Sequence, residues 1–158
     1  MKRFTIVDWL PWLMILMCMP VLTGCPIVVP VIDSFKQMGM TEGDRKNLLK
    51  PVVMGFQRAL SSGDLDGALS YLKADDPRLR QSIIDEVRSN KHKEKVVDSN
   101  MDLVLYSDEA RRAEVEVLVK YFEVPYYVVR QRVEKGDWEF SHKDGWKLVA
   151  RSVHEVSQ

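Results

Sequence analysis

Apolar residues first recur at helical spacing in residues 41–62. Thr41 and Asp44 match the capping box that opens many helices, and Gly63 is the residue type that most often follows the end of one. Pro51 falls inside this run, so it predicts either a kinked helix or the true first turn. The apolar positions of this first expected helix are Leu48, Leu49, Val52, Val53, Phe56, Ala59 and Leu60.

Two shorter helices follow in the pattern. Asp64 is suited to cap the first of them, and Asp76 the second, since the next residue is Pro77 and proline is tolerated in a first helical turn. Asn90 is a typical stop for the second of these helices. Their apolar stripes are Leu65, Ala68, Leu69 and Leu72 in the one, and Leu79, Ile83, Ile84 and Val87 in the other.

After a charged loop at residues 91–95, the spacing of apolar positions changes to two, the period of a strand with one buried face. Residues 112–121 alternate most regularly, and Asp144-Gly145 predicts a tight hairpin turn. Further strands are expected over residues 101–105, 126–134, 138–140 and 146–150. The positions expected on the core face are Met101, Leu103, Leu105, Ala113, Val115, Val117, Val119, Tyr121, Trp138, Phe140, Trp146, Leu148 and Ala150.

Helices followed by strands predict an α+β fold, in which three N-terminal helices pack on one face of an antiparallel β-meander of four to five strands. The 158 residues suffice for one domain with a hydrophobic core. The 23 basic and 23 acidic residues balance, which argues against a nucleic-acid-binding protein. Both cysteines, Cys18 and Cys25, lie near the N-terminus, so we expect no disulfide inside the domain.

The N-terminal residues have the layout of a secretory signal. Lys2-Arg3 precedes an apolar stretch from Trp9 to Val21, which is shorter than the roughly 20 apolar residues of a membrane-spanning helix. The stretch closes with Leu22-Thr23-Gly24-Cys25, which resembles the cleavage and lipidation box of bacterial lipoproteins. The resemblance implies that residues 1–24 are a signal peptide that is removed. It also implies that Cys25 then carries a thioether-linked diacylglycerol and an acylated amino group.

Under this interpretation residues 25–40 are the lipidated cysteine and a tether, and residues 41–158 are a single domain. The lipid on Cys25 would attach the protein to a membrane. In lipoproteins of Gram-negative bacteria an Asp after the cysteine favours the inner membrane, and here Pro26 stands in its place. The implied location is therefore the outer membrane, facing the periplasm. An uncleaved membrane anchor and a plain signal peptide are the alternatives.

A second resemblance covers about residues 48–152. The run from Phe56 to Asp64 (Phe-Gln-Arg-Ala-Leu-Ser-Ser-Gly-Asp), with Ala68 and Leu72, is similar to the opening helices of nuclear transport factor 2-like domains. The segment from Trp138 to Leu148, with its Lys143-Asp144-Gly145-Trp146 turn, resembles their last hairpin. The family implies a cone-like domain, a curved sheet wrapped over helices and often enclosing a pocket. Its members include ketosteroid-isomerase-like enzymes, scaffolds and lipid-anchored domains, so the fold does not give the function.

The sequence shows no pattern typical of catalysis or metal binding. Enzymes of this family place an Asp, Tyr or His inside the cone, and we expect no carboxylate on the apolar face of the sheet. Glu114 and Glu116 fall on the opposite, solvated face. The three histidines, in a loop, a turn and the C-terminal tail, lack metal-ligand spacing: His92, His142 and His154. We therefore predict no catalytic residue, no metal and no cofactor.

Two sets of residues are weaker candidates for binding. Aromatic residues could line the mouth of the cone for an apolar ligand, with ordinary core and strand packing as the alternative. This set is Tyr121, Tyr126, Tyr127, Trp138 and Trp146. Basic residues could form a stripe that contacts lipid headgroups or a partner, or could simply alternate with glutamates on a solvated face. This second set is Arg111, Arg112, Lys120, Arg130 and Arg132.

The resulting hypothesis is a membrane-anchored lipoprotein of the bacterial envelope that acts as a non-catalytic binding module. Its partner would be an envelope protein or a small apolar ligand, and not a nucleic acid. One alternative is a small cone-fold enzyme, isomerase or hydrolase-like, with an unrecognised pocket. Another is an immunity or envelope-assembly lipoprotein.

Overall fold

Helix α3 (Glu42–Ser62) begins where the capping box predicts. The backbone N–H of Asp44 donates to Thr41 Oγ1 at 3.2 Å, and the N–H of Thr41 donates to Asp44 Oδ2 at 3.2 Å. Gly63 ends the helix with a φ of 72°, a left-handed conformation that glycine adopts with little strain. Pro51 lies inside the helix and not in its first turn.

The computed structural model that shows these contacts describes residues 38–73, 76–90 and 93–156. The predictions for the signal peptide (residues 1–24), for Cys25 and for most of the tether lie outside the described residues, as does that for His92. At the end of the predicted tether, Gly39 is buried and its carbonyl accepts a hydrogen bond from Arg45 Nη1 at 3.1 Å. None of the described helices is long and apolar enough to span a membrane.

Helices α4 (Leu65–Ser70) and α5 (Pro77–Asn90) start at the two predicted aspartates. Asp64 Oδ1 accepts a hydrogen bond from the Gly67 N–H at 3.0 Å. Asp76 Oδ1 accepts hydrogen bonds from the first turn of α5, at 2.8 Å from the N–H of Arg78 and at 3.1 Å from that of Leu79. Side-chain oxygens at these positions satisfy backbone donors that the helix itself cannot pair.

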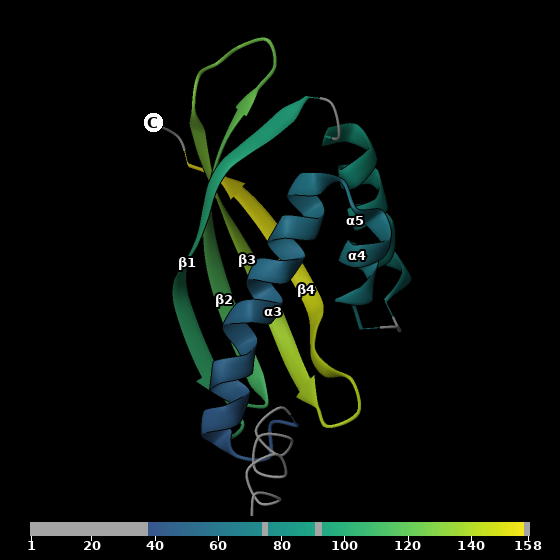
Figure 1. Cartoon of the computed structure of the whole chain (residues 1–158), viewed down its shortest axis with the longest axis vertical. Coiled ribbons are helices and arrows are strands. Elements are labelled where there is room, and N and C mark those ends of the chain that lie inside the picture. Colours follow the sequence, from purple (N-terminus) through teal and green to yellow (C-terminus); the bar gives the residue numbers. More distant parts are fainter. Residues whose placement is uncertain (1–37, 74–75, 91–92, 157–158) are drawn as a thin grey trace, which may run out of the picture. The chain divides into compact units, whose positions relative to one another are not determined.

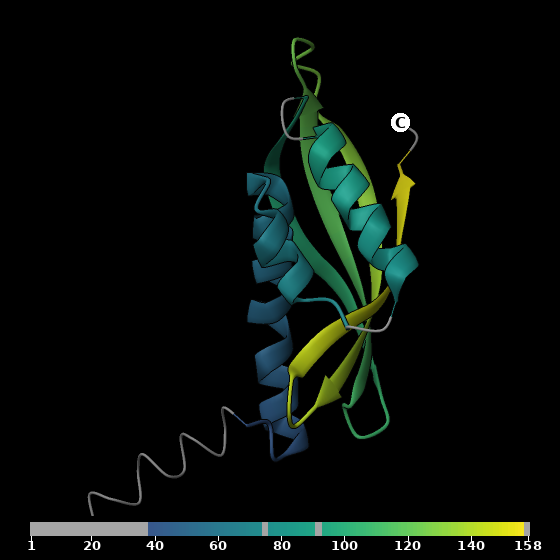
Figure 2. The ribbon, with the colours of Figure 1, turned by 90° about the vertical axis from the view of Figure 1, so that its right-hand side faces the viewer.

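The strands β1 (Glu94–Ser107), β2 (Arg112–Glu123), β3 (Arg130–Ser141) and β4 (Gly145–Glu155) form an antiparallel meander in the order β1-β2-β3-β4. The three described helices cover one face of this curved sheet, with α3 running along it and α4 and α5 beside β4 (Figures 1 and 2). The predicted α+β class is thus confirmed, with four strands in the described part of the chain.

The regular alternation predicted for residues 112–121 is confirmed. Every second side chain from Ala113 to Tyr121 is at most 3% exposed, and four of these five join a core cluster with α3 and α5. In this cluster Phe56 packs edge-on against Trp138 at a ring-centroid distance of 5.9 Å. Gly136 makes room for this packing, because a Cβ there would come within 2.9 Å of Trp138 Nε1. The members of the cluster on β2 are Ala113, Val115, Val117 and Val119.

The strand predicted over residues 126–134 is wrong in its first half. Residues 124–129 form an exposed loop, and β3 starts at Arg130 and runs without a break to Ser141. Tyr126 to Val129 have strong β-propensity, but no neighbouring strand pairs with them. His154, predicted in a C-terminal tail, is part of β4.

Two register shifts change which side chains face the core. In β1 a shift between Met101 and Leu103 turns Val104 inward, so Leu103 and Leu105 are 42% and 53% exposed instead of buried. In β4, Leu148 pairs with Trp138 of β3 and Ala150 pairs with Asp137, so Val149 between them is an extra residue that forms a bulge. Beyond this bulge Ala150 faces solvent, contrary to the prediction, and the Arg151 side chain is only 5% exposed.

Candidate functional site

A buried carboxylate lies at the centre of the domain, on the core face of β3. Glu134 is 2% exposed and belongs to the inward-facing series that ends with Trp138. The prediction that this face carries no carboxylate is therefore wrong. A buried ionisable group among apolar side chains is a common feature of functional sites, so its environment decides what it can do.

Two arginines and an amide surround this carboxylate. Arg132 Nε donates to Glu134 Oε1 at 2.7 Å, while Gln57 Nε2 from α3 donates to Oε2 at 2.9 Å. Arg151 Nη2 donates to the same Oε2 at 2.8 Å. Three elements thus hold both oxygens: β3, β4 and α3. The bulge in β4 is needed for this arrangement, because without it Arg151 would face away from the core.

Each arginine also binds a second carboxylate at the edge of the cluster. Arg132 Nη1 donates to Glu94 Oε2 of β1 at 2.6 Å, and Arg151 Nη2 donates to Glu86 Oε1 of α5 at 2.9 Å. The two outer carboxylates are only 11% and 20% exposed. Among the described residues, no buried side-chain nitrogen or oxygen lacks a hydrogen-bond partner. The five charged groups and Gln57 therefore form a closed network linking α3, α5, β1, β3 and β4, which we call the Glu134 network.

The electrostatics of the network keep Glu134 ionised. Burial by itself would raise the pKa of Glu134, but the guanidinium groups of Arg151 and Arg132 and the Gln57 amide lower it below its ordinary value. Burial likewise opposes the charged form of both arginines, and the adjoining carboxylates raise their pKa values in spite of it. A carboxylate held ionised by two arginines is a weak proton acceptor, because a general base needs a pKa near the working pH.

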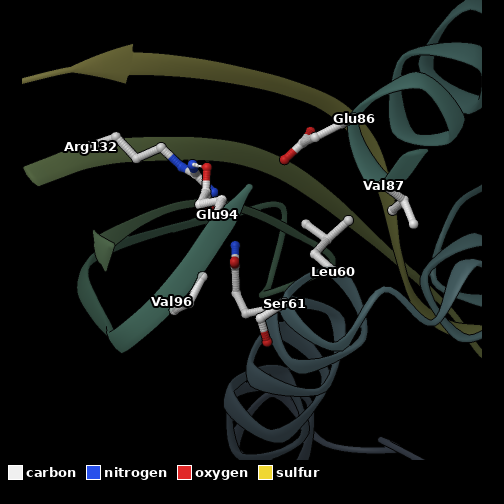
Figure 3. Close-up of a pocket in the computed structure, with 8 residues that line it drawn as sticks. Leu60, Ser61, Glu86, Val87, Glu94, Val96 and Arg132 are labelled. Atoms are coloured by element: carbon white, nitrogen blue, oxygen red, sulfur yellow. Dashed lines mark hydrogen bonds and ion pairs between the residues drawn. The ribbon is translucent and has the colours of Figure 1, made fainter. Parts of the chain in front are cut away.

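The space beside the Glu134 network is too small for an organic substrate. Figure 3 shows the hollow between α3, α5, β1 and β3, with Glu94 and Arg132 on one side and Leu60 and Val87 on another. It measures about 20 Å³, and a second hollow beside Glu134 and Trp138 about 10 Å³. Such spaces hold about one water molecule each, whereas small-molecule sites usually measure about 300–1,000 Å³.

The structure does not bring the predicted aromatic ligand-binding set together. Trp138 and Trp146 are each 3% exposed, and Trp146 Nε1 donates to the Arg45 carbonyl at 2.8 Å near the start of α3. Tyr121 is also buried, at the other end of β2, where its hydroxyl lies 3.3 Å from Glu155 Oε1. In contrast, Tyr126 and Tyr127 are 72% and 76% exposed in the loop between β2 and β3.

The structure does not bring the candidate basic residues together as one stripe either. Arg132 faces the core, and its guanidinium carbon lies 4.8 Å from the centroid of the Tyr121 ring. Arg130 is exposed and lies 3.9 Å from Glu123, whereas Arg111 and Arg112 are at the opposite end of β2. Glu114 and Glu116 do fall on the outer face, where Glu116 pairs with Lys135. No group of His, Cys, Asp or Glu that could hold a metal ion occurs in the ranges described.

Two open grooves lie on the outside of the domain. One, of about 370 Å³, crosses the outer face of the sheet near the β1–β2 turn and is lined by residues such as Leu105, Tyr106, Glu114 and Val149. The other, of about 240 Å³, lies at the opposite end of the sheet, where Tyr121 and Val128 meet the last residues of β4. Space for a ligand or partner is therefore found on the surface, at both ends of the sheet.

Sequence reasoning missed the Glu134 network. One signal pointed to part of it: counting back in twos from Trp138 places Gly136, Glu134 and Arg132 on the core face. The inward turn of Arg151 had no such signal, because it depends on a bulge that residue types alone do not specify.

No protein-family model matches the chain, and no curated protein is detectably similar to it in sequence. The solved structures that share its fold include the following three. The intermembrane space region of the chloroplast protein ARC6 is 19% identical with a TM-score of 0.51, over 70% of this chain and 96% of that one. A ketosteroid isomerase-like protein from Erwinia carotovora atroseptica is 11% identical with a TM-score of 0.56, over 70% and 95%.

The third structure, Bd1075 from Bdellovibrio bacteriovorus, is 13% identical with a TM-score of 0.55, over 73% of this chain and 42% of that one. At these identities the likeness concerns the fold alone. The domain therefore has a nuclear transport factor 2-like fold, in agreement with the resemblance of its first helices and last hairpin.

Proposed function

We propose that this protein is a lipid-anchored component of the bacterial envelope whose nuclear transport factor 2-like domain binds a protein partner through its outer surface. The observation that carries the proposal is the filled interior, where the Glu134 network and core side chains leave hollows of about 20 and 10 Å³. Surface grooves of about 370 and 240 Å³ offer space where the interior offers little. The enzyme alternative is less well supported, because Glu134, the carboxylate buried in the described part of the chain, is a weak base.

The anchoring part of the proposal rests on Leu22-Thr23-Gly24-Cys25. We expect cells that produce the full chain to incorporate a palmitate analogue into it, and Cys25→Ser to abolish the incorporation. Cys18→Ser is the matched control, because that cysteine would leave with the signal peptide. Equal labelling of the Cys25→Ser variant, or a mature protein that retains residues 1–24, would contradict the lipid anchor.

The binding part is tested separately, by native mass spectrometry of the protein extracted from its envelope in mild detergent. We expect a mass equal to the acylated polypeptide, without a retained small molecule. A photo-reactive amino acid at Glu114, in the outer groove, should yield a cross-link to one defined envelope protein. A stoichiometric small molecule that is lost in Gln57→Trp, a substitution at a residue that lines both interior hollows, would instead support the enzyme alternative or an enclosed ligand.

A further inference from the structure

The loop between β2 and β3 exposes a continuous apolar segment. Its five apolar side chains are between 43% and 76% exposed, although valine and tyrosine are usually at least half buried. The loop projects beyond the end of the sheet, as both views show (Figures 1 and 2). We call this segment the hairpin tip: Val124, Pro125, Tyr126, Tyr127, Val128 and Val129. Exposed apolar patches of this kind mark sites that contact a protein or a membrane.

Basic side chains surround the base of the hairpin tip. The Lys93 carbonyl accepts a hydrogen bond from the Val124 N–H at 2.8 Å, which places this exposed lysine beside the loop. Lys95 pairs with Phe122 across the sheet and is also exposed, as is Arg130 at the start of β3. Two carboxylates lie nearby, but Glu123 faces Arg130 at 3.9 Å and Glu155 accepts a hydrogen bond from the Tyr121 hydroxyl. The charge balance of these five side chains is positive.

The composition and shape of the tip favour a lipid bilayer over a protein partner. Tyrosine is enriched where membranes meet water, because its ring is apolar and its hydroxyl is polar. Basic residues next to such a segment attract anionic headgroups. The loop has unpaired backbone groups, so it suits the polar interface and not the hydrocarbon core. A stable protein interface needs about 800 Å² on each side, and a narrow projecting loop offers a poor surface of that kind.

The distance between the tip and the expected anchor permits this contact. The tip and the first turn of α3 lie at opposite ends of the domain (Figure 1). Helix α3 has 21 residues and is therefore about 31 Å long. A chain of the length between Cys25 and Met40 can span about 50 Å, so a domain held by such a tether can still bring its far end to the same bilayer.

We infer that the hairpin tip is a second membrane contact, which inserts Tyr126 and Tyr127 into the interface of an anionic bilayer while Lys93, Lys95 and Arg130 face the headgroups. This rests on the proposed envelope location, but it concerns a surface that the lipid on Cys25 does not involve. The two contacts together would hold the domain close to the membrane.

The inference can be tested with the full chain in vesicles of phosphatidylethanolamine and phosphatidylglycerol that contain lipids brominated on their acyl chains. Tyr127→Trp places a reporter at the tip, and Leu105→Trp places one at an exposed position near the other end of the sheet. The unsubstituted protein gives the background of its own tryptophans. We expect bromine to quench the added emission at position 127 and to leave that at position 105 unchanged.

Replacing Lys93 and Lys95 together by Gln in the Tyr127→Trp background should reduce the quenching in anionic vesicles, as should added salt. Equal emission at position 127 with and without bromine would overturn the inference, and so would equal quenching at both positions. A tip that cross-links to an envelope protein and stays unquenched would assign the surface to a protein partner and would also overturn it. Palmitate labelling of Cys25 is measured independently, so failure of the tip and failure of the lipid anchor are distinguishable.

Discussion

Gln57 of α3 donates a hydrogen bond to Glu134 of β3 at 2.9 Å, across the interior of the domain and 77 positions away along the chain. The acceptor is Oε2 of Glu134, which also accepts a hydrogen bond from Arg151, so side chains from α3 and β4 meet at this one oxygen atom. The contact links the helical layer to the sheet at a polar point inside an otherwise apolar core. Several consequences of the Glu134 network can be measured as changes in stability.

The first is a dependence of stability on pH. The folded state lowers the pKa of Glu134 below the ordinary value of 4.5. The unfolded chain therefore binds a proton more readily, and the stabilisation by this carboxylate is fully present above about pH 4.5 and is lost as the pH falls through the lower folded value. We expect the free energy of unfolding, measured in urea by tryptophan fluorescence, to fall steeply in this acidic range.

Glu134→Gln should reduce the stability at pH 7 by about 3 kcal/mol, because it leaves two buried arginines with less compensating charge. The same variant should lose less additional stability on acidification than the parent protein. Glu114→Gln, on the outer face, is the control and should change the free energy of unfolding by no more than about 0.5 kcal/mol. Parallel pH profiles for the parent and Glu134→Gln would show that Glu134 is not the titrating group.

The local signals in the sequence predicted the helices and the first long strand well, because each depended on residues close together in the chain. Thr41, Gly63, Asp64 and Asp76 all act at the positions expected of helix caps. The alternation of residues 112–121 likewise depends only on the period of a strand. These features follow from backbone geometry and from one buried face.

The remaining features depend on pairing between distant segments. Tyr126 to Val129 have the composition of a strand, yet strand formation needs a hydrogen-bonding neighbour, and none pairs with them. The shifts in β1 and β4 arise from the match between strands and reverse the exposure of Leu105 and Ala150. Glutamate is usually exposed, so its residue type does not predict the burial of Glu134. The buried carboxylate is stabilised by two arginine partners, one of which comes from the neighbouring strand β4.

The shift in β1 predicts opposite results for neighbouring residues. Val104→Ala should cost about 1–2 kcal/mol, since this side chain packs against the core and loses about 0.8 kcal/mol for each buried carbon removed. Leu105→Ala should stay within about 0.5 kcal/mol, because Leu105 is 53% exposed. Urea unfolding of both variants checks the pair, and a larger loss for Leu105→Ala would place the shift elsewhere in β1.

Trp146 combines a packing contribution with a hydrogen bond to the Arg45 carbonyl. Trp146→Ala should lower the free energy of unfolding by about 3–5 kcal/mol, as for other large buried aromatic residues. Trp146→Phe should cost less and still more than about 1 kcal/mol, because it removes the indole hydrogen bond and part of the buried ring. Thermal and urea unfolding give both values, and a loss below about 1 kcal/mol for the alanine variant would mean that this side chain is not part of the core.

Two glycines at the ends of α3 should respond oppositely to alanine. Gly63 has a φ of 72°, where a side chain costs about 1–2 kcal/mol, so Gly63→Ala should destabilise the domain by that amount. Gly43 lies in the first turn, and a Cβ there has its nearest neighbour, Thr41 Oγ1, at 3.9 Å. Gly43→Ala should therefore raise the free energy of unfolding by about 0.5–1 kcal/mol, since alanine loses less backbone freedom than glycine on joining a helix. Urea titrations of the two variants make each the control for the other. If Gly63→Ala were as stable as the parent protein, residue 63 would not have the left-handed conformation that follows the end of α3 at Ser62. The short connection between α3 and α4 would then have a different geometry.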